Sequence, residues 1–147
     1  MAQAQQTSWT EKDVRSATTI EPLQIAEEYV RMPGDLAYWN GQYADAQEGY
    51  LRAKLRREEG EARTRLRVRG EAELEGKRVT ESHVDALVST DPDYLAVSEQ
   101  EIAAEVLKVK VIGVVDAIRA KRDMLISLGA HLRMEQDPQV NKDRKRG

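Results

Sequence analysis

The chain has 147 residues, which is the length of one domain, and 33% of them are charged, with a formal net charge of -3. It has no Phe, so we expect long helices that complete their core by self-association rather than a thick globular core. It also has no Cys, which excludes a disulfide framework and thiolate chemistry. No apolar run approaches the roughly 18 residues that span a bilayer, and the first residues lack the pattern of a signal peptide. These features predict a soluble cytoplasmic protein with no membrane partner.

The small net charge hides four blocks of alternating sign. Residues 1–50 carry a net charge of -5, residues 51–70 carry +5, residues 71–107 carry -8 and residues 108–147 carry +5. Such asymmetry describes the partners of a protein rather than its fold. The basic blocks could bind nucleic acid, or they could bind the acidic blocks of a neighbouring copy.

The N-terminal part of the chain predicts an arm followed by a short helix. Residues 1–18 are typical of a disordered arm. A helix is predicted from about Glu21 to Arg31, because Thr19 can cap it and Pro22 suits its first turn. The "MPGD" sequence at 32–35 is expected to end this helix, since Pro-Gly is a strong break.

A second helix is predicted to start with Asp35 as its cap. Apolar residues recur at spacings of three and four, which indicates one buried stripe: Leu36, Trp39, Tyr43, Ala46, Tyr50 and Ala53. A further line continues the helix to about residue 66 or beyond: Leu51, Leu55, Ala62 and Leu66. The alternative is a helix that ends at Gly60, followed by a short strand from Ala62 to Val68. Residues 70–79 are rich in glycine and charge, which predicts the loop at the tip of a hairpin.

The C-terminal part predicts a short helix and then a long one. Thr80 can cap the first, Glu81 to Val88, and Asp91 with Pro92 can begin the second, which runs to about Glu135. A heptad seam follows the long helix: Leu107, Val111, Val114, Ile118, Lys121, Leu125, Leu128 and Leu132. A second apolar line lies beside it: Leu95, Ile102, Val106, Val109, Gly113, Ala117, Ala120 and Met124.

Two stripes on one helix indicate two partners, one being the Trp39 helix and the other a second subunit. We expect the oligomer interface to use the apolar residues of the seam: Leu107, Val111, Val114, Ile118, Leu125, Leu128 and Leu132. The fold class that follows is all-α. It consists of a long antiparallel helical hairpin over residues 19–136 that assembles as a ring-like homo-oligomer, and a basic disordered tail over 137–147.

The chain offers little for catalysis. His83 and His131 stand alone in helical patterns, so a zinc site is not expected. There is no glycine-rich phosphate loop, and the many carboxylates fall at spacings typical of solvated ion pairs on helices. We therefore expect no enzyme activity, no cofactor and no metal.

The basic segment is the one positive signal of a binding site. Its eight bases fall within 18 residues of an acidic protein: Arg52, Lys54, Arg56, Arg57, Arg63, Arg65, Arg67 and Arg69. As a strand, the last four arginines would face one way; as a helix, the arginines would form two rows. Either row can neutralise successive phosphates and release counterions, and the planar guanidinium suits phosphate well. A solvated charged face remains the alternative. Tyr50, next to this segment, is a candidate for base stacking.

Residues Leu36 to Glu135 resemble the phage recombination mediator protein UvsY family. "LAYWNGQYADAQEGYLRA" is similar to that family's first long helix, with its tryptophan near the start. "EARTRLRV" falls where the family carries a basic-x-basic motif, at a matching distance from Trp39. The segment from "VSTDPDYLAV" to "HLRME" is similar to the family's C-terminal helix in length and pattern.

The resemblance implies a non-enzymatic loader of a RecA-type recombinase in the cytoplasm of an infected bacterium. It implies binding to single-stranded DNA, assembly as a ring-like homo-oligomer and displacement of the single-stranded DNA-binding protein. The family's basic motif falls on Arg63 and Arg65. Two other interpretations remain open: a scaffolding coiled-coil protein whose basic block pairs with a neighbour's acidic block, and a prefoldin-like chaperone with a β-hairpin near 60–80.

Overall fold

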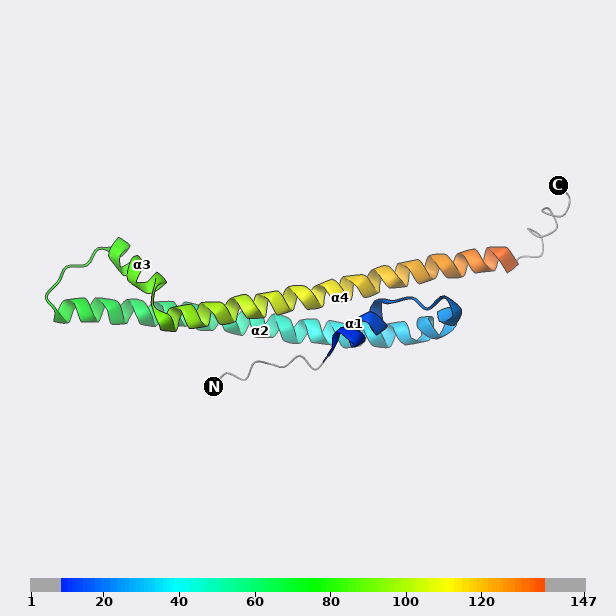
Figure 1. The fold of residues 1–147 in the computed structure, drawn as a ribbon, viewed down its shortest axis with the longest axis horizontal. Helices are drawn as coiled ribbons and strands as arrows, with labels where there is room; N and C mark the ends of the chain where they lie inside the picture. The colour runs from blue at the N-terminus through cyan, green and yellow to red at the C-terminus, as the bar shows by residue number, and fades with distance from the viewer. Residues whose placement is uncertain (1–8, 137–147) are drawn as a thin grey trace. The chain divides into compact units, whose positions relative to one another are not determined.

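The computed structural model describes residues 9–136, which form helices joined by short turns. The elements in chain order are α1 (Glu11–Thr18), the 3-10 helix η1 (Pro22–Gln24), α2 (Ile25–Leu74), α3 (Glu81–Ser89) and α4 (Pro92–Gln136) (Figure 1). The predicted all-α class is confirmed, and the alternative strand at 62–68 is wrong because these residues lie inside α2. Within the described range, no helix is both long and apolar enough to cross a membrane. The predicted basic tail at 137–147 lies outside the described residues.

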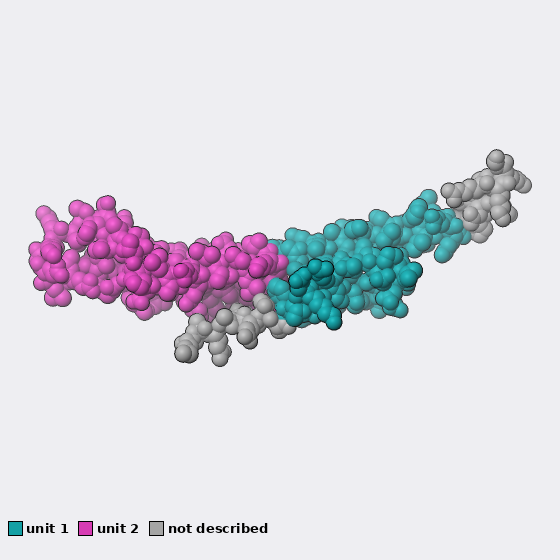
Figure 2. Space-filling view, viewed as in Figure 1, with its two compact units in different colours: residues 1–41, 112–147 teal, residues 42–111 magenta. Residues whose placement is uncertain are grey.

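The chain divides into two compact units, shown in different colours in Figure 2. Unit 1 contains the described residues up to Gly41 and from Ile112 onward, and unit 2 contains residues 42–111. Within each unit, a segment of α2 packs against a segment of α4 that runs in the opposite direction (Figure 1). The expected antiparallel pairing of the two long helices is therefore present within each unit, and α3 belongs to unit 2.

Helix α1 occupies part of the segment predicted to be a disordered arm. It forms because Thr10 and Asp13 make a capping box, in which each residue's side chain bonds the other's backbone N–H. These hydrogen bonds from Thr10 lower the pKa of the Asp13 carboxyl below its ordinary value of 3.8. Ala17 is buried, which anchors the helix on unit 1. The prediction of disorder over 1–18 is thus wrong for residues 11–18.

Helix α2 starts at Ile25 and continues through the Pro-Gly sequence that was expected to end the first helix. Pro33 lacks an N–H and so removes one helical hydrogen bond. The helix tolerates this loss because neighbouring side chains hold it on both sides of the proline. Met32 is buried in unit 1, and Arg31 bonds Asp35 at 3.1 Å across the proline. Asp35, predicted to cap a second helix, is instead a partner in this ion pair.

The tip between α2 and α3 is shorter than the predicted loop at 70–79, because α2 extends to Leu74. Gly76 then adopts a φ of 67°, the left-handed conformation that favours glycine, and the N–H of Lys77 reaches back to the Ala72 carbonyl at 3.0 Å. Thr80 caps α3 through the N–H of His83 as predicted. A β-hairpin, which the prefoldin-like interpretation requires near 60–80, is not present in this fully described segment.

Unit 2 has a narrow core. Two buried valines of α3, Val84 and Val88, pack on Val68 of α2, with Val79 and Tyr94 at the edge of the cluster. Asp91 begins α4 as predicted, since its carboxylate accepts hydrogen bonds from two of the following backbone N–H groups. The other buried apolar residues that α2 contributes to the core of unit 2 are alanines: Ala46, Ala53 and Ala72.

The two apolar lines of α4 have different environments. The seam faces α2, and five of its residues are buried inside one chain: Val111, Val114, Ile118, Lys121 and Leu125. Four of these belong to the set expected at an oligomer interface, so that prediction is corrected for them. Leu107 is half-buried, whereas Leu128 and Leu132 are exposed.

The second line is the one left on the surface. Its large residues are all exposed: Leu95, Ile102, Val106, Val109 and Met124. Residues of this line stand about 110° around α4 from the seam, because each residue turns an α-helix by about 100°. The exposed face therefore lies beside the seam, as the sequence predicted.

We expect Gly41→Ala and Gly113→Ala each to raise the free energy of unfolding by up to about 1 kcal/mol, because glycine is the costlier residue in a helix interior. An added Cβ would meet no atom within 4 Å at either position. Urea unfolding followed by circular dichroism measures the effect. Gly76→Ala is the contrast, and should be destabilising because of its left-handed backbone. A loss of stability in either helical variant would contradict an uninterrupted helix at that position.

Candidate nucleic-acid interface

All eight candidate bases lie on α2, and the helix separates them onto different sides. Successive residues turn by about 100° along an α-helix, so Arg63 and Arg65 point in nearly opposite directions. A single file of four arginines is therefore not formed. Arg52, Arg56 and Arg63 share one sector, which we call the outer row. The other arginines are engaged by carboxylates from elsewhere in unit 2.

The outer row is open to solvent. Among residues 9–136, Arg52 bonds only Glu48 and Arg63 bonds only Glu59, each at 2.6 Å and each one helical turn away. The Arg63 side chain is 78% exposed. Such exposed pairs contribute about 0.3–0.5 kcal/mol, so a phosphate can replace the carboxylate at little cost. Arg56 has no ion pair among residues 9–136.

Lys54 and Arg57 belong neither to the outer row nor to the arginines that pair with α3 or with Asp91. Lys54 is exposed and has no ion pair within the described residues, but it lies on the opposite flank of α2 from the outer row. Arg57 is largely covered. It bonds Glu101 of α4 and Glu61 of α2, the latter at 3.2 Å, so it joins the two helices.

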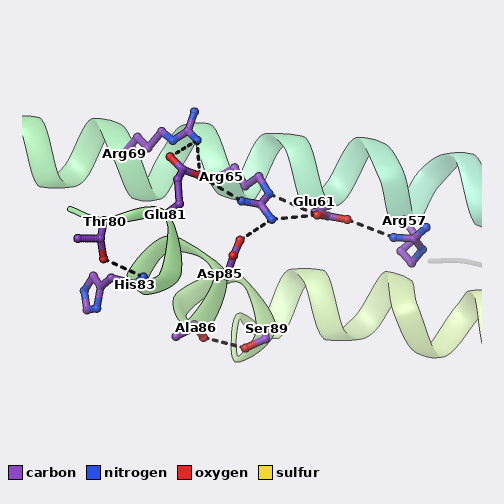
Figure 3. A network of polar contacts seen from close by, with 10 residues as sticks. All are labelled: Arg57, Glu61, Arg65, Arg69, Thr80, Glu81, His83, Asp85, Ala86 and Ser89. Carbon is purple, nitrogen blue, oxygen red and sulfur yellow. Dashed lines mark hydrogen bonds and ion pairs between the residues drawn. The ribbon is translucent and has the colours of Figure 1, made fainter.

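Two further arginines lie one turn apart on another side of α2 and form what we call the covered row: Arg65 and Arg69. Arg65 bonds Asp85 of α3 at 2.6 Å and Glu61 at 3.3 Å (Figure 3). Arg69 donates to both carboxylate oxygens of Glu81 at 2.8 and 2.9 Å. The carboxylates that face this row come mainly from α3, which Figure 3 shows beneath the arginines.

Arg67 lies in the same sector of α2 as the outer row, but the residue that begins α4 engages it. It bonds Asp91 and, at 3.4 Å, Glu71. Partial burial opposes ionisation of Asp91, but backbone N–H groups and the charge of Arg67 outweigh it, so the pKa of Asp91 is lowered. The charges of Asp91 and Glu71 raise the pKa of Arg67 in turn. The basic block thus pairs with acidic residues of its own chain.

The aromatic residues serve mainly in packing. Trp39 is buried in unit 1, where Trp9 and Tyr38 contact it edge-to-face with ring centroids 5.3 and 5.5 Å away. Tyr50 is half-buried, and Lys108 Nζ lies 3.9 Å from the centre of its ring. One face of the Tyr50 ring is therefore occupied by a cation rather than open to a base.

The histidines take ordinary positions on the helices. His131 lies 3.2 Å from Glu135, one turn along α4, and the backbone N–H of His83 donates to the hydroxyl of Thr80, which caps α3. In the part of the chain that the structure describes, no three metal-binding side chains come together.

Comparisons of the chain with protein-family models, curated proteins and solved structures gave no match. The arguments for a function rest on the residues themselves.

Proposed function

We propose that the protein is a non-enzymatic single-stranded DNA-binding protein of the recombination-mediator type. In this role it helps to load a RecA-type recombinase by displacing the single-stranded DNA-binding protein in the cytoplasm of an infected bacterium. The observation that carries the DNA-binding part is the outer row. Its guanidinium groups share one exposed face of α2 and are held by at most one local carboxylate each.

The spacing of the outer row suits an extended polyanion. At 1.5 Å per residue, Arg52 and Arg56 are about 6 Å apart along the helix and Arg56 and Arg63 about 10 Å apart. A phosphate backbone that follows this face can bond each guanidinium in turn. Contacts to phosphates carry no sequence information, which agrees with a protein that handles single strands of any sequence.

Three phosphate contacts per chain give weak binding, so we propose that the protein acts as a homo-oligomer. Repetition of the outer row around an assembly raises the effective concentration for each further contact. The exposed apolar line of α4 offers a surface for that association. The mediator role itself comes from the resemblance of residues 36–135 to the UvsY family, and its partners follow from that resemblance.

The outer-row triple variant Arg52→Ala/Arg56→Ala/Arg63→Ala should bind single-stranded DNA at least about 10-fold more weakly. Its salt dependence should also be shallower by about 2 in the log–log slope, because single strands contribute about 0.7 per phosphate contact. Fluorescence anisotropy with a labelled oligothymidine at several salt concentrations measures both quantities.

A control variant separates local contacts from net charge. Arg15→Ala/Arg119→Ala/Arg122→Ala removes three exposed arginines that also hold only local carboxylates. It should lose little affinity. Equal losses in the two triple variants, or an unchanged salt slope in the outer-row variant, would refute the outer row as the binding face. Recombinase filament assembly on strands coated with single-stranded DNA-binding protein then tests the loading role.

A helical scaffold is the second candidate, and one observation favours it: much of the basic block is already neutralised within the chain. A scaffold predicts assembly through the exposed line of α4 with negligible DNA binding. Measuring the oligomeric mass and titrating single-stranded DNA on the same sample distinguishes the two candidates.

A further inference from the structure

The covered row has the chemistry of a phosphate-binding site that is already filled. Each of its arginines bonds a carboxylate that lies 12 to 20 residues further along the chain. Arg69 donates to both carboxylate oxygens of Glu81, and Arg65 pairs with one oxygen of Asp85. The guanidinium fork binds carboxylate and phosphate in the same manner, so the carboxylates stand where phosphate oxygens would stand.

The carboxylates of α3 are accessible to competitors. The side chains of Glu81 and Asp85 are 70% and 58% exposed. Ion pairs in such surroundings are screened by salt and exchange readily. A polyanion that approaches Arg65 and Arg69 therefore competes with α3 for charges that water already reaches.

Helix α3 is held by few contacts. It has nine residues, and only Val84 and Val88 of these are buried, against Val68. A helix of this length is not stable on its own. Short segments connect α3 to α2 and α4, and Gly76 in the first of them adopts a left-handed backbone conformation. The free energy needed to displace α3 is therefore the loss of contacts in the small valine cluster and of the ion pairs.

We propose that α3 is a displaceable acidic cover over a second phosphate-binding site, formed by Arg65 and Arg69. The ligand is the backbone of single-stranded DNA, which first binds the outer row. It then displaces the carboxylates of Glu81 and Asp85 from the covered row. This inference rests on the proposed function, and it adds an autoinhibitory contact that keeps the affinity of the free protein low.

The test compares two neutralised double variants in the full chain. The cover variant is Glu81→Gln/Asp85→Asn. The control is Glu73→Gln/Glu99→Gln, which changes the net charge equally at residues that hold no ion pair among the described residues. The cover variant should bind oligothymidine at least about 10-fold more tightly than the control, with a salt slope steeper by about 1.4.

Hydrogen exchange gives a second measurement that needs no variant. Saturating oligothymidine should reduce the protection of the amides of α3 in the wild-type chain while α4 keeps its protection. Equal affinities of the cover and control variants, together with unchanged hydrogen exchange in α3, would refute the proposal that α3 is a displaceable cover.

A parallel titration with inorganic polyphosphate separates this inference from the proposed function. If no form of the protein binds DNA but the cover variant gains polyphosphate binding over the control, the cover stands and the proposed function falls. If the wild-type chain binds DNA through the outer row but the cover variant gains neither ligand, only the cover is overturned. A cover variant that gains neither ligand in a chain that does not bind DNA overturns both.

Discussion

Replacing Lys121 with alanine is expected to lower the free energy of unfolding by about 3–5 kcal/mol, which is the cost of removing one partner from a buried ion pair. The Lys121 and Glu28 side chains are only 1% and 6% exposed, and Lys121 Nζ lies 2.5 Å from Glu28 Oε2. The same ammonium group donates to the carbonyl oxygen of Ala17 at 3.1 Å. Without Lys121, the carboxylate stays buried and keeps only Arg31, at 3.1 Å.

Two controls identify the cause of that loss. Lys110→Ala removes an exposed lysine of the same helix and should change stability by less than about 0.5 kcal/mol. The double variant Glu28→Gln/Lys121→Met removes both charges and should recover most of the loss, since apolar replacement of a buried pair is often neutral. Urea unfolding measures all three. A cost below about 1 kcal/mol for Lys121→Ala would show that water solvates Glu28 in its place.

Replacing Gly60 with valine is expected to destabilise unit 2 by about 3 kcal/mol, at the upper end of the usual cost of overpacking. A Cβ at this position would lie 2.9 Å from Cγ2 of Val97, which is closer than carbon atoms approach. Val97 is β-branched and has little rotamer freedom in a helix. The clash can therefore be relieved only by moving α2 and α4 apart in unit 2.

The double variant Gly60→Val/Val97→Ala tests that explanation directly. Removing the two methyl groups of Val97 should restore a large part of the stability that Gly60→Val loses. Gly70→Val on the same helix is the matched control, because an added Cβ there meets nothing within 4 Å. If Gly60→Val and Gly70→Val proved equally stable, the close approach of the two helices at Gly60 would be wrong.

Local signals predicted the elements of the second half of the chain correctly. Thr80 and the Asp91-Pro92 pair stand at the starts of α3 and α4, where capping chemistry requires such residues. Thr10 and Asp13 have the spacing of a capping box, which is a local signal for α1 within a polar segment. The Pro33 error has another origin. Burial of Met32 and the Arg31–Asp35 pair outweighed a local preference for a break.

The candidate site shows where sequence alone was insufficient. The strand and helix interpretations each predict rows of arginines, but they do not predict the same surface. The helix places Arg63 on an open face and Arg65 beside α3. The pairing of Arg67 with Asp91 spans 24 residues. Block charges show that such pairs are possible, but only the packing of α3 determines which carboxylate meets which arginine.

The same limit applies to the two apolar lines of α4. Both lines have helical spacing, so the pattern alone cannot show which one turns toward α2. The answer depends on the rotation of one helix against another, which is set by packing between residues far apart in the chain.

The buried pair of Glu28 and Lys121 also selects the alignment of the helices in unit 1. An apolar seam that repeats every seven residues tolerates a slip of one heptad, since Val, Ile and Leu replace one another with little loss. Such a slip would bring Val114 or Leu128 to the level of Glu28 and leave a carboxylate without its ammonium partner. Hydrophobic packing alone would give the aligned and the slipped arrangements almost the same free energy. One lysine among the apolar residues therefore removes these misaligned states from the folding landscape and leaves a single way to close unit 1.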